Sequence, residues 1–192
     1  MTHKKPTHET LTQKTLTQKI MPKETMTQKT MTQKTMTKET MIRKEKEITD
    51  TSDIETVIAQ TPVCRLGLSD GAAPYIVPLC FGYEDGTIYV HSALKGKKID
   101  LIQTHPDVCV EFDTDVETID SGRACNWGMS YKSVIAFGRA SFLENRDEKK
   151  RALGIIIGHY SDKSFALPDK AVDKTAVIKI EISRMTGKQS RI

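Results

Sequence analysis

The chain has 192 residues, of which 38% are hydrophobic and 28% are charged, a composition that suits one globular domain of ordinary size. Its formal net charge of +4 comes from the first 40 residues, which hold eight lysines and three glutamates, whereas the remainder holds 21 basic and 22 acidic residues. The near-neutral remainder argues against a nucleic-acid-binding face, because phosphate contacts need Lys and Arg clustered on the folded surface.

Neither a membrane segment nor a secretory signal is predicted. The longest apolar run, Ala152–Ile157, is far shorter than the roughly 20 residues that a membrane helix needs. The N-terminus carries Lys and Thr throughout and has no continuous apolar core. Without a signal peptide, we expect a cytoplasmic protein. Because Cys64, Cys80, Cys109 and Cys125 form no CxxC pair, we expect these cysteines to be reduced and to bind no metal.

Residues 10–41 repeat every five residues around the unit Thr-Gln-Lys-Thr-Met. Five residues rotate a helix by about 140° and change the face of a strand, so neither structure gathers the repeated Leu and Met side chains on one face. We therefore predict a disordered low-complexity tail over 1–40 and a folded domain over 41–192. A sticky, phase-separating tail is the alternative, and Met41 is a candidate for the original start of the protein.

The domain is predicted to begin with a helix and three strands. Ser52 and Glu55 have the spacing of a capping box, which predicts a helix over 53–60 that Pro62 ends. Turn sequences at 70–71 and 84–86 separate the apolar runs that follow. Strands are therefore predicted over 63–69, 75–83 and 87–92, joined as hairpins.

The second half is predicted to contain two more helices and three more strands. The expected elements are a helix over 95–105, a strand over 108–113, a polar loop over 115–130, a strand over 131–143, a helix capped by Asn145, and a sixth strand over 176–182. Gly138 suits a bulge in the fifth strand or a bend at a barrel corner. The third helix has Leu153, Ile156, Ile157 and Tyr160 at helical spacing. Six strands with a few helices predict a mainly β domain, a small closed or partly open antiparallel barrel, with a sandwich as the alternative.

Six strings of residues, taken together and in order, resemble the pyridoxamine 5'-phosphate oxidase-like superfamily and, within it, the branch of nitroimidazole-resistance proteins. They are Cys64–Leu68, Tyr75–Leu79 with Phe81–Tyr83, Tyr89–Ala93, Gly96–Leu101, Tyr131–Val134 with Phe137–Ala140, and Met185–Lys188. The resemblance runs through nearly all of 41–188. It implies a six-stranded antiparallel split barrel that forms a homodimer and binds FMN in clefts at the subunit interface.

The resemblance also implies a set of cofactor-binding residues, which are Val77, Pro78, His91, Ser92, Lys97, Lys98, Ser133 and Val134. Lys98 has the place of the family's phosphate-binding lysine, and Lys97 lies beside it. Both follow a strand and open a helix, where amides, helix dipole and Lys charge together favour an anion. Two lysines on a short helix are also a common solvated surface feature, and that interpretation stays open.

Three further features of the resemblance concern the flavin ring and the dimer. The strand around Val77 and Pro78 would line the ring, and Pro78 removes one amide donor from that strand. Ser133 and Val134 would reach the cofactor across the dimer, with core packing as the alternative for Val134. His91 is a candidate catalytic residue that moves a proton, or else a structural histidine.

These residues support two functional hypotheses. The first is an FMN-dependent oxidoreductase that passes electrons to a small molecule, a nitroimidazole or other nitroaromatic being one candidate. The second is a non-catalytic flavin- or haem-binding protein on the same fold, with His91 structural or an axial ligand. Oxidation of pyridoxamine phosphate itself is disfavoured, because only Arg184 and Arg191 lie near the C-terminus.

Overall fold

The structure is a computed structural model that describes residues 43–190; the predicted tail over 1–40 lies outside this range. Eight strands and four α-helices are present in the described residues. The strands are β1 (Glu47–Ile48), β2 (Cys64–Leu68), β3 (Tyr75–Leu79), β4 (Phe81–Glu84), β5 (Thr87–Ala93), β6 (Asp107–Ile119), β7 (Gly128–Phe142) and β8 (Thr175–Ser190). The helices are α1 (Thr51–Gln60), α2 (Lys97–Thr104), α3 (Arg146–Tyr160) and α4 (Asp169–Asp173), with short 3-10 turns η1 (Lys44–Lys46) and η2 (Ala124–Asn126).

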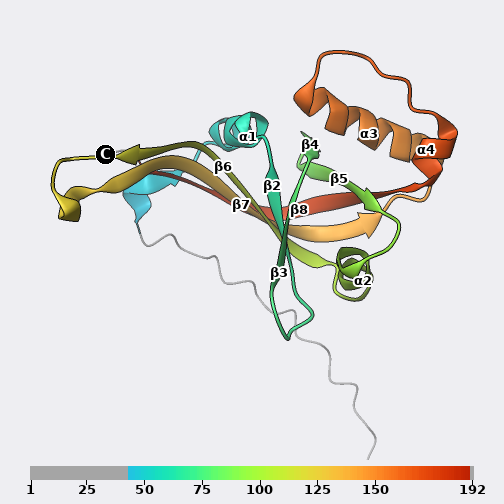
Figure 1. Cartoon of the computed structure of the whole chain (residues 1–192), viewed down its shortest axis with the longest axis horizontal. Coiled ribbons are helices and arrows are strands. Elements are labelled where there is room, and N and C mark those ends of the chain that lie inside the picture. The colour runs from blue at the N-terminus through green and yellow to red at the C-terminus, as the bar shows by residue number, and fades with distance from the viewer. Residues whose placement is uncertain (1–42, 191–192) are drawn as a thin grey trace, which may run out of the picture. The chain divides into compact units, whose positions relative to one another are not determined.

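All strands belong to one antiparallel sheet in the order β3-β2-β6-β7-β8-β5-β4, with β1 added to β8. The edge strands β3 and β4 are separated in the chain by Cys80 alone, so the sheet must curl until its two edges meet (Figure 1). No ladder joins β3 to β4 within the described residues, and the sheet is therefore not closed. The predicted mainly antiparallel split barrel is confirmed, with eight strands in the described residues where six were predicted.

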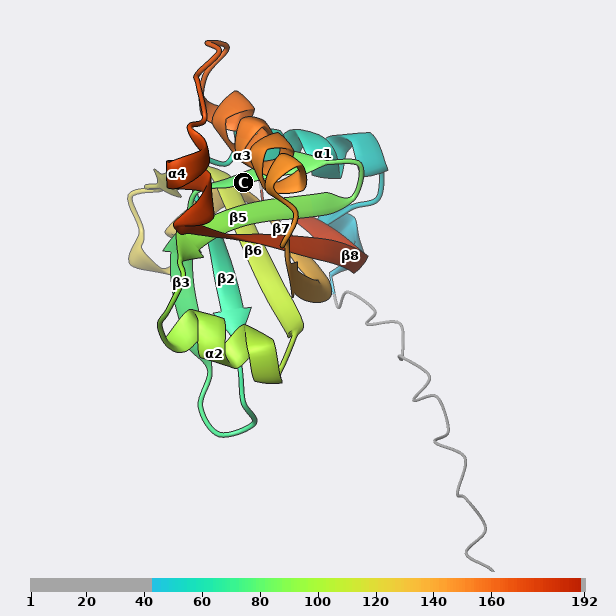
Figure 2. The same cartoon turned by 90° about the vertical axis from the view of Figure 1, so that its right-hand side faces the viewer.

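The barrel interior holds the main hydrophobic core. Leu66, Val110, Phe112, Val134 and Ile180 are each 0–1% exposed and point inward from β2, β6, β7 and β8. Helices complete this core: α2 lies against β2 and β7, and α1 lies against β6 and β7 (Figure 2). A second, smaller cluster lies on the outer side of the sheet, where α3 covers β4 and β5.

Three predicted elements differ from the structure. The sixth strand, expected over 176–182, is the longer β8 (Thr175–Ser190). The strand expected over 75–83 is divided at Cys80, because there the chain leaves the β2 edge and joins β5 at the opposite edge. The loop expected over 115–130 is mostly a long β6–β7 hairpin, in which Glu117–Ile119 pair with Gly128–Ser130. Its side chains are largely exposed on both faces, so the apolar alternation that reveals a half-buried strand is missing.

The helix caps are partly as predicted. Asn145 caps α3, its side chain accepting hydrogen bonds from the amides of Asp147 (2.9 Å) and Glu148 (3.1 Å), as expected. The cap of α1 is Asp50 instead of Ser52: its carboxylate accepts from the amide (2.8 Å) and the hydroxyl (2.7 Å) of Ser52. The Asp50 carboxylate can accept both hydrogen bonds at once, and its negative charge interacts favourably with the positive end of the helix dipole.

The predicted bulge or bend at Gly138 coincides with a bulge whose extra residue, Ser183, belongs to β8. The register of β7 against β8 shifts between Phe137 and Gly138. A Cβ at Gly138 would collide with the carbonyl of Glu181 on β8. The residue therefore has to be glycine for the two long strands to cross closely at this corner.

Candidate functional site

Two backbone edges without strand partners lie where the barrel is split. β3 pairs only with β2 in the described residues. The ladder between β4 and β5 ends at the pair Phe81 and Val90, so residues 91–93 of β5 pair with β8 alone. We call residues 75–79 of β3 and 91–93 of β5 the split edge. Their free N–H and C=O groups are available to a ligand.

The N-terminus of α2 follows the split edge directly. Gly96 begins the helix with φ of +130°, a conformation that favours glycine, and no side chain caps it. Its carbonyl accepts from the amides of Ile99 (2.8 Å) and Asp100 (3.1 Å). The amides of Lys97 and Lys98 have no protein acceptor in the described part of the chain, which leaves two N–H donors and the positive end of the dipole for an anion.

The two lysines predicted to bind phosphate lie between α2 and the strands β2 and β3. The Lys97 ammonium is 4.7 Å from the centre of the Tyr75 ring, a cation–π contact. Lys98 is half-buried, and burial lowers the pKa of its ammonium, while the nearby Cys64 thiol acts in the opposite direction. Neither lysine forms an ion pair with a described carboxylate. Both charges are therefore available to a ligand.

His91 and Ser92 belong to the split edge but point to opposite faces of β5. Ser92 is two residues after Val90 and therefore lies on the same face of β5, and Val90 packs into the barrel core. His91 lies on the opposite face, which it shares with Tyr89. Tyr89 packs under α3, whereas the His91 side chain is exposed. Only Ser92 therefore shares the inward face, and His91 can reach the same ligand only around the free edge.

Val77 and Pro78 lie on β3, as the sequence predicts. Pro78 is exposed and opposite Arg65 on an edge strand, where a missing amide costs no ladder hydrogen bond. Val77 is half-buried against the core. The contact that joins this strand to α2 is that of Lys97 of α2 with Tyr75 at the start of β3.

Ser133 and Val134 lie elsewhere in the same chain. Val134 is 0% exposed in the core, so only its backbone is available to a ligand. Ser133 pairs with Lys188 and His91 pairs with Val177, so eleven residues of β8 separate them, up to about 36 Å along the strand. On its other side Ser133 pairs with Asp113 of β6, whose ion-pair partner Arg65 lies opposite Pro78, so Ser133 is three strands away from the β3 part of the split edge.

The structure also shows residues that the sequence reasoning missed or left open. The sequence reasoning missed the contact of Tyr75 with Lys97. An aromatic residue at the first position of the edge strand could have indicated a contact with a nearby cation. Trp127 lies next to η2 in the β6–β7 hairpin and is 55% exposed, so it fills no core gap.

The outer face of the sheet next to Pro78 combines exposed apolar side chains with cross-strand ion pairs. Ile76 is 65% exposed and Ile135 is 41% exposed. Arg65 of β2 binds Glu111 (3.1 Å) and Asp113 of β6, and burial raises the pKa of Glu111. This face is therefore neither uniformly polar nor covered by a helix.

Comparison with known proteins identifies the family of this chain. The family model described as pyridoxamine 5'-phosphate oxidase matches residues 50–189. The chain belongs to this family. No curated protein matches the chain.

Solved structures include a relative on the predicted branch of the family. A candidate 5-nitroimidazole antibiotic resistance protein of Bacteroides thetaiotaomicron is 36% identical, with a TM-score of 0.68, and the match covers 74% of this chain and 86% of that chain. A flavocytochrome of Azotobacter vinelandii (18% identity, TM-score 0.70, 80% and 73% covered) and an FAD- and haem-binding protein of Mycobacterium smegmatis (15%, 0.70, 77% and 74%) share the fold.

Proposed function

We propose that this member of the pyridoxamine 5'-phosphate oxidase family is an FMN-dependent oxidoreductase that reduces a small acceptor, with nitroimidazoles as the first candidates. The observation that carries the proposal is the meeting of two unpaired lysines, two free helix amides and the split edge in one place. The 36% identity to a candidate nitroimidazole-resistance protein supports the acceptor class. We expect the protein to act in the cytoplasm.

The chemistry of the donor set fits the phosphate of FMN. A phosphate monoester is a dianion with several acceptor oxygens, and it is best held by charged donors together with amides. Lys97 and Lys98 offer two ammonium groups and two amides within one helical turn, and the Ser92 hydroxyl lies at the end of the preceding strand. These residues would bind the phosphate and thereby orient the rest of the cofactor.

The free edge of β3 fits the flavin ring. Edge strands expose alternate N–H and C=O groups, and these match the alternating acceptors and donors on the pyrimidine side of isoalloxazine. Pro78 has no N–H and would leave a neighbouring carbonyl as the acceptor at that position. When bound, the flavin would supply the electron transfer, and the chain would supply position, hydrogen bonds and exclusion of water.

A homodimer completes the proposed site. The family resemblance implies that Ser133 reaches the cofactor across the dimer, and the β8 partners of Ser133 and His91 lie eleven positions apart along that strand. The exposed Ile76 and Ile135 beside the Arg65 ion pairs give the sheet a face that suits such contact. The clefts would then lie at the subunit interface.

His91 is the proposed proton-transferring residue. Its exposed imidazole makes no hydrogen bond within residues 43–190, and imidazole is the side chain that most often serves as general acid or base in enzymes. It would give a proton to the acceptor as that acceptor is reduced. The same free imidazole favours the second candidate function, a flavin- or haem-binding protein without turnover, in which His91 is an axial ligand.

A visible spectrum of the purified full-length chain tests the proposal. We expect flavin bands that bleach on anaerobic addition of a reduced nicotinamide and return when a nitroimidazole is added. A Soret band would favour the haem alternative. Flavin bands that neither bleach nor return would exclude the oxidoreductase and leave a binding protein.

A further inference from the structure

The first residue of α2 is a lysine that lies over an aromatic ring. Lys97 is exposed, and its ammonium nitrogen lies 4.7 Å from the centre of the Tyr75 ring. The helix lies beside the β2–β3 hairpin, whose second strand begins with Tyr75 (Figure 2). An exposed lysine otherwise samples many rotamers, and a cation–π contact favours those that keep the ammonium over the ring.

Tyr75 is itself held in place. It pairs with Leu68 in the β2–β3 ladder, and Leu68 is 3% exposed. The Tyr75 ring is half-buried and packs against the barrel core. Its hydroxyl makes no hydrogen bond to a described residue, so the face of the ring is the part of Tyr75 that acts on Lys97.

The three lysines around Gly96 differ in what restricts them. Lys98 is half-buried near the Cys64 thiol, whereas Lys97 is exposed and contacts the Tyr75 ring. Lys95 is exposed and contacts neither a ring nor a carboxylate in the described part of the chain. An aromatic ring leaves the charge of a lysine unneutralised, whereas a carboxylate in the same place would compete with an anionic ligand.

We propose that Tyr75 is a positioning residue for the phosphate end of the site. It holds the Lys97 side chain at the helix end that also carries two free amides, so a phosphate monoester meets a donor that is already ordered. Ordering a side chain before the ligand arrives removes part of the entropic cost of binding. This inference rests on the proposed function and deepens it, because Tyr75 then favours a flavin with a phosphate over the same flavin without one.

The role of Tyr75 is tested by the binding of FMN and of riboflavin, which has the same ring but no phosphate, to the full-length chain freed of flavin. We expect Tyr75→Leu to lower the preference for FMN over riboflavin by about two- to fivefold, which corresponds to an exposed cation–π contact. Tyr75→Phe keeps the ring and should keep the preference. A merely structural role would weaken the binding of both ligands equally and leave the preference unchanged.

A double-mutant cycle with Lys97 shows whether Tyr75 acts through that lysine. In a Lys97→Ala background, Tyr75→Leu should have no further effect on the preference for FMN, because the group that the ring holds is gone. The matched background is Lys95→Ala, which removes an exposed lysine that contacts no ring in the described residues. There, Tyr75→Leu should have its full effect.

The results separate this inference from the proposed function. A parent chain that binds FMN, with an unchanged preference in Tyr75→Leu, would overturn the role of Tyr75 and leave the FMN site in place. An equal reduction in Tyr75→Phe, or a further reduction in the Lys97→Ala background, would also overturn it. A parent chain that binds no FMN would refute the proposed function and the inference with it. Thermal unfolding establishes that each variant is folded, and Tyr75→Ile, which is β-branched and suits a strand, replaces Tyr75→Leu if that variant does not fold.

Discussion

At the scale of single residues, part of the family resemblance encodes packing and part encodes chemistry. A Cβ at Gly82 would lie 2.7 Å from the backbone of Ile155, and one at Gly187 would lie 2.8 Å from Cβ of Ile48. With Gly138, these glycines occur in three of the six strings that indicated the family. They are required by close contacts of the barrel and say nothing about a cofactor, whereas Lys97 and Lys98 have no such packing role.

Replacing Gly138 tests this packing interpretation. The Gly138→Ala variant should lose about 1–3 kcal/mol of unfolding free energy, because the new methyl meets the Glu181 carbonyl on a neighbouring strand that cannot retreat. Gly154→Ala is the control: it lies in α3 with open space around the new methyl and should gain up to about 1 kcal/mol. Urea unfolding measures both, and equal stability of the two variants would refute the packing role.

The sequence located residues better than it located their surroundings. The two lysines could be placed at a strand-to-helix junction, because turn and cap signals are local. Lys149 could not be recognised as buried: Leu153, Ile156, Ile157 and Tyr160 suggested one apolar face, but the buried face is shifted to Lys149, Ala152 and Ile156. Which face is covered depends on the sheet beneath α3, and that contact is not local.

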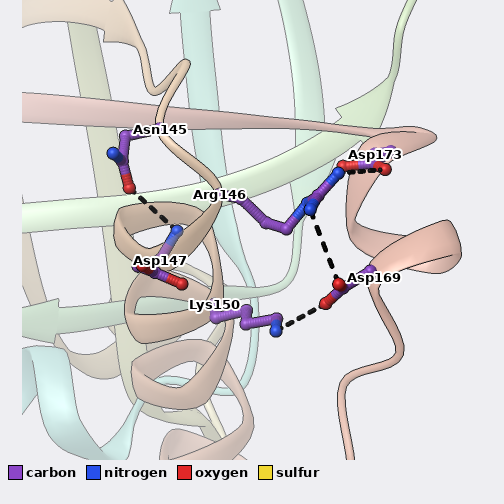
Figure 3. A network of polar contacts seen from close by, with 6 residues as sticks. All are labelled: Asn145, Arg146, Asp147, Lys150, Asp169 and Asp173. Atoms are coloured by element: carbon purple, nitrogen blue, oxygen red, sulfur yellow. Dashed lines mark hydrogen bonds and ion pairs between the residues drawn. The ribbon is translucent and has the colours of Figure 1, made fainter.

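At the scale of elements, α4 is fixed to the start of α3 by charge. Arg146 binds Asp169 and Asp173, and Lys150 binds Asp169 (Figure 3). The pKa of Asp173 is lowered from 3.8, chiefly by the hydrogen bond from Arg146. Because the folded pKa lies below the unfolded one, the stabilisation is fully present above about pH 4 and is lost as the pH falls through the folded pKa.

The Asp173→Asn variant should therefore be less stable than the parent chain near neutral pH and should approach it in strong acid. The control is Asp162→Asn, which makes the same charge change at a carboxylate without an ion pair in the described residues. Urea unfolding at low salt across the acidic range measures the difference. A difference that persisted below the folded pKa of Asp173 would contradict the role given to this ion pair.

The strands show where local patterns suffice and where they fail. Turn signals and alternation located part of each main strand of the barrel, since each has one face in the core, but they missed the two-residue β1 and residues 183–190 of β8. They could not show that Cys80 divides the strand expected over 75–83, because the division comes from the two edges of a curled sheet meeting there. The exposed half of the β6–β7 hairpin was missed for the opposite reason, since it has no buried face.

At the scale of the whole domain, the antiparallel split barrel and the family are established, and the proposed function depends on the split itself. A fully closed barrel would pair residues 75–79 and 91–93 and leave no free edge beside α2. The sequence after residue 40 is nearly neutral, so the unpaired Lys97 and Lys98 do not belong to a generally basic surface. The proposed second copy follows from the family resemblance and not from chain periodicity, because a homodimer contact leaves no pattern within one sequence.

The most direct test of the central claim is the FMN content of the purified chain after replacement of the two lysines at α2. We expect Lys97→Ala with Lys98→Ala to weaken FMN binding by at least about tenfold, because each charged hydrogen bond lost is worth about 1.5–3 kcal/mol. The control is Lys95→Ala, an exposed lysine before Gly96, which should retain full FMN content. Unchanged FMN content in a folded double variant would contradict the account.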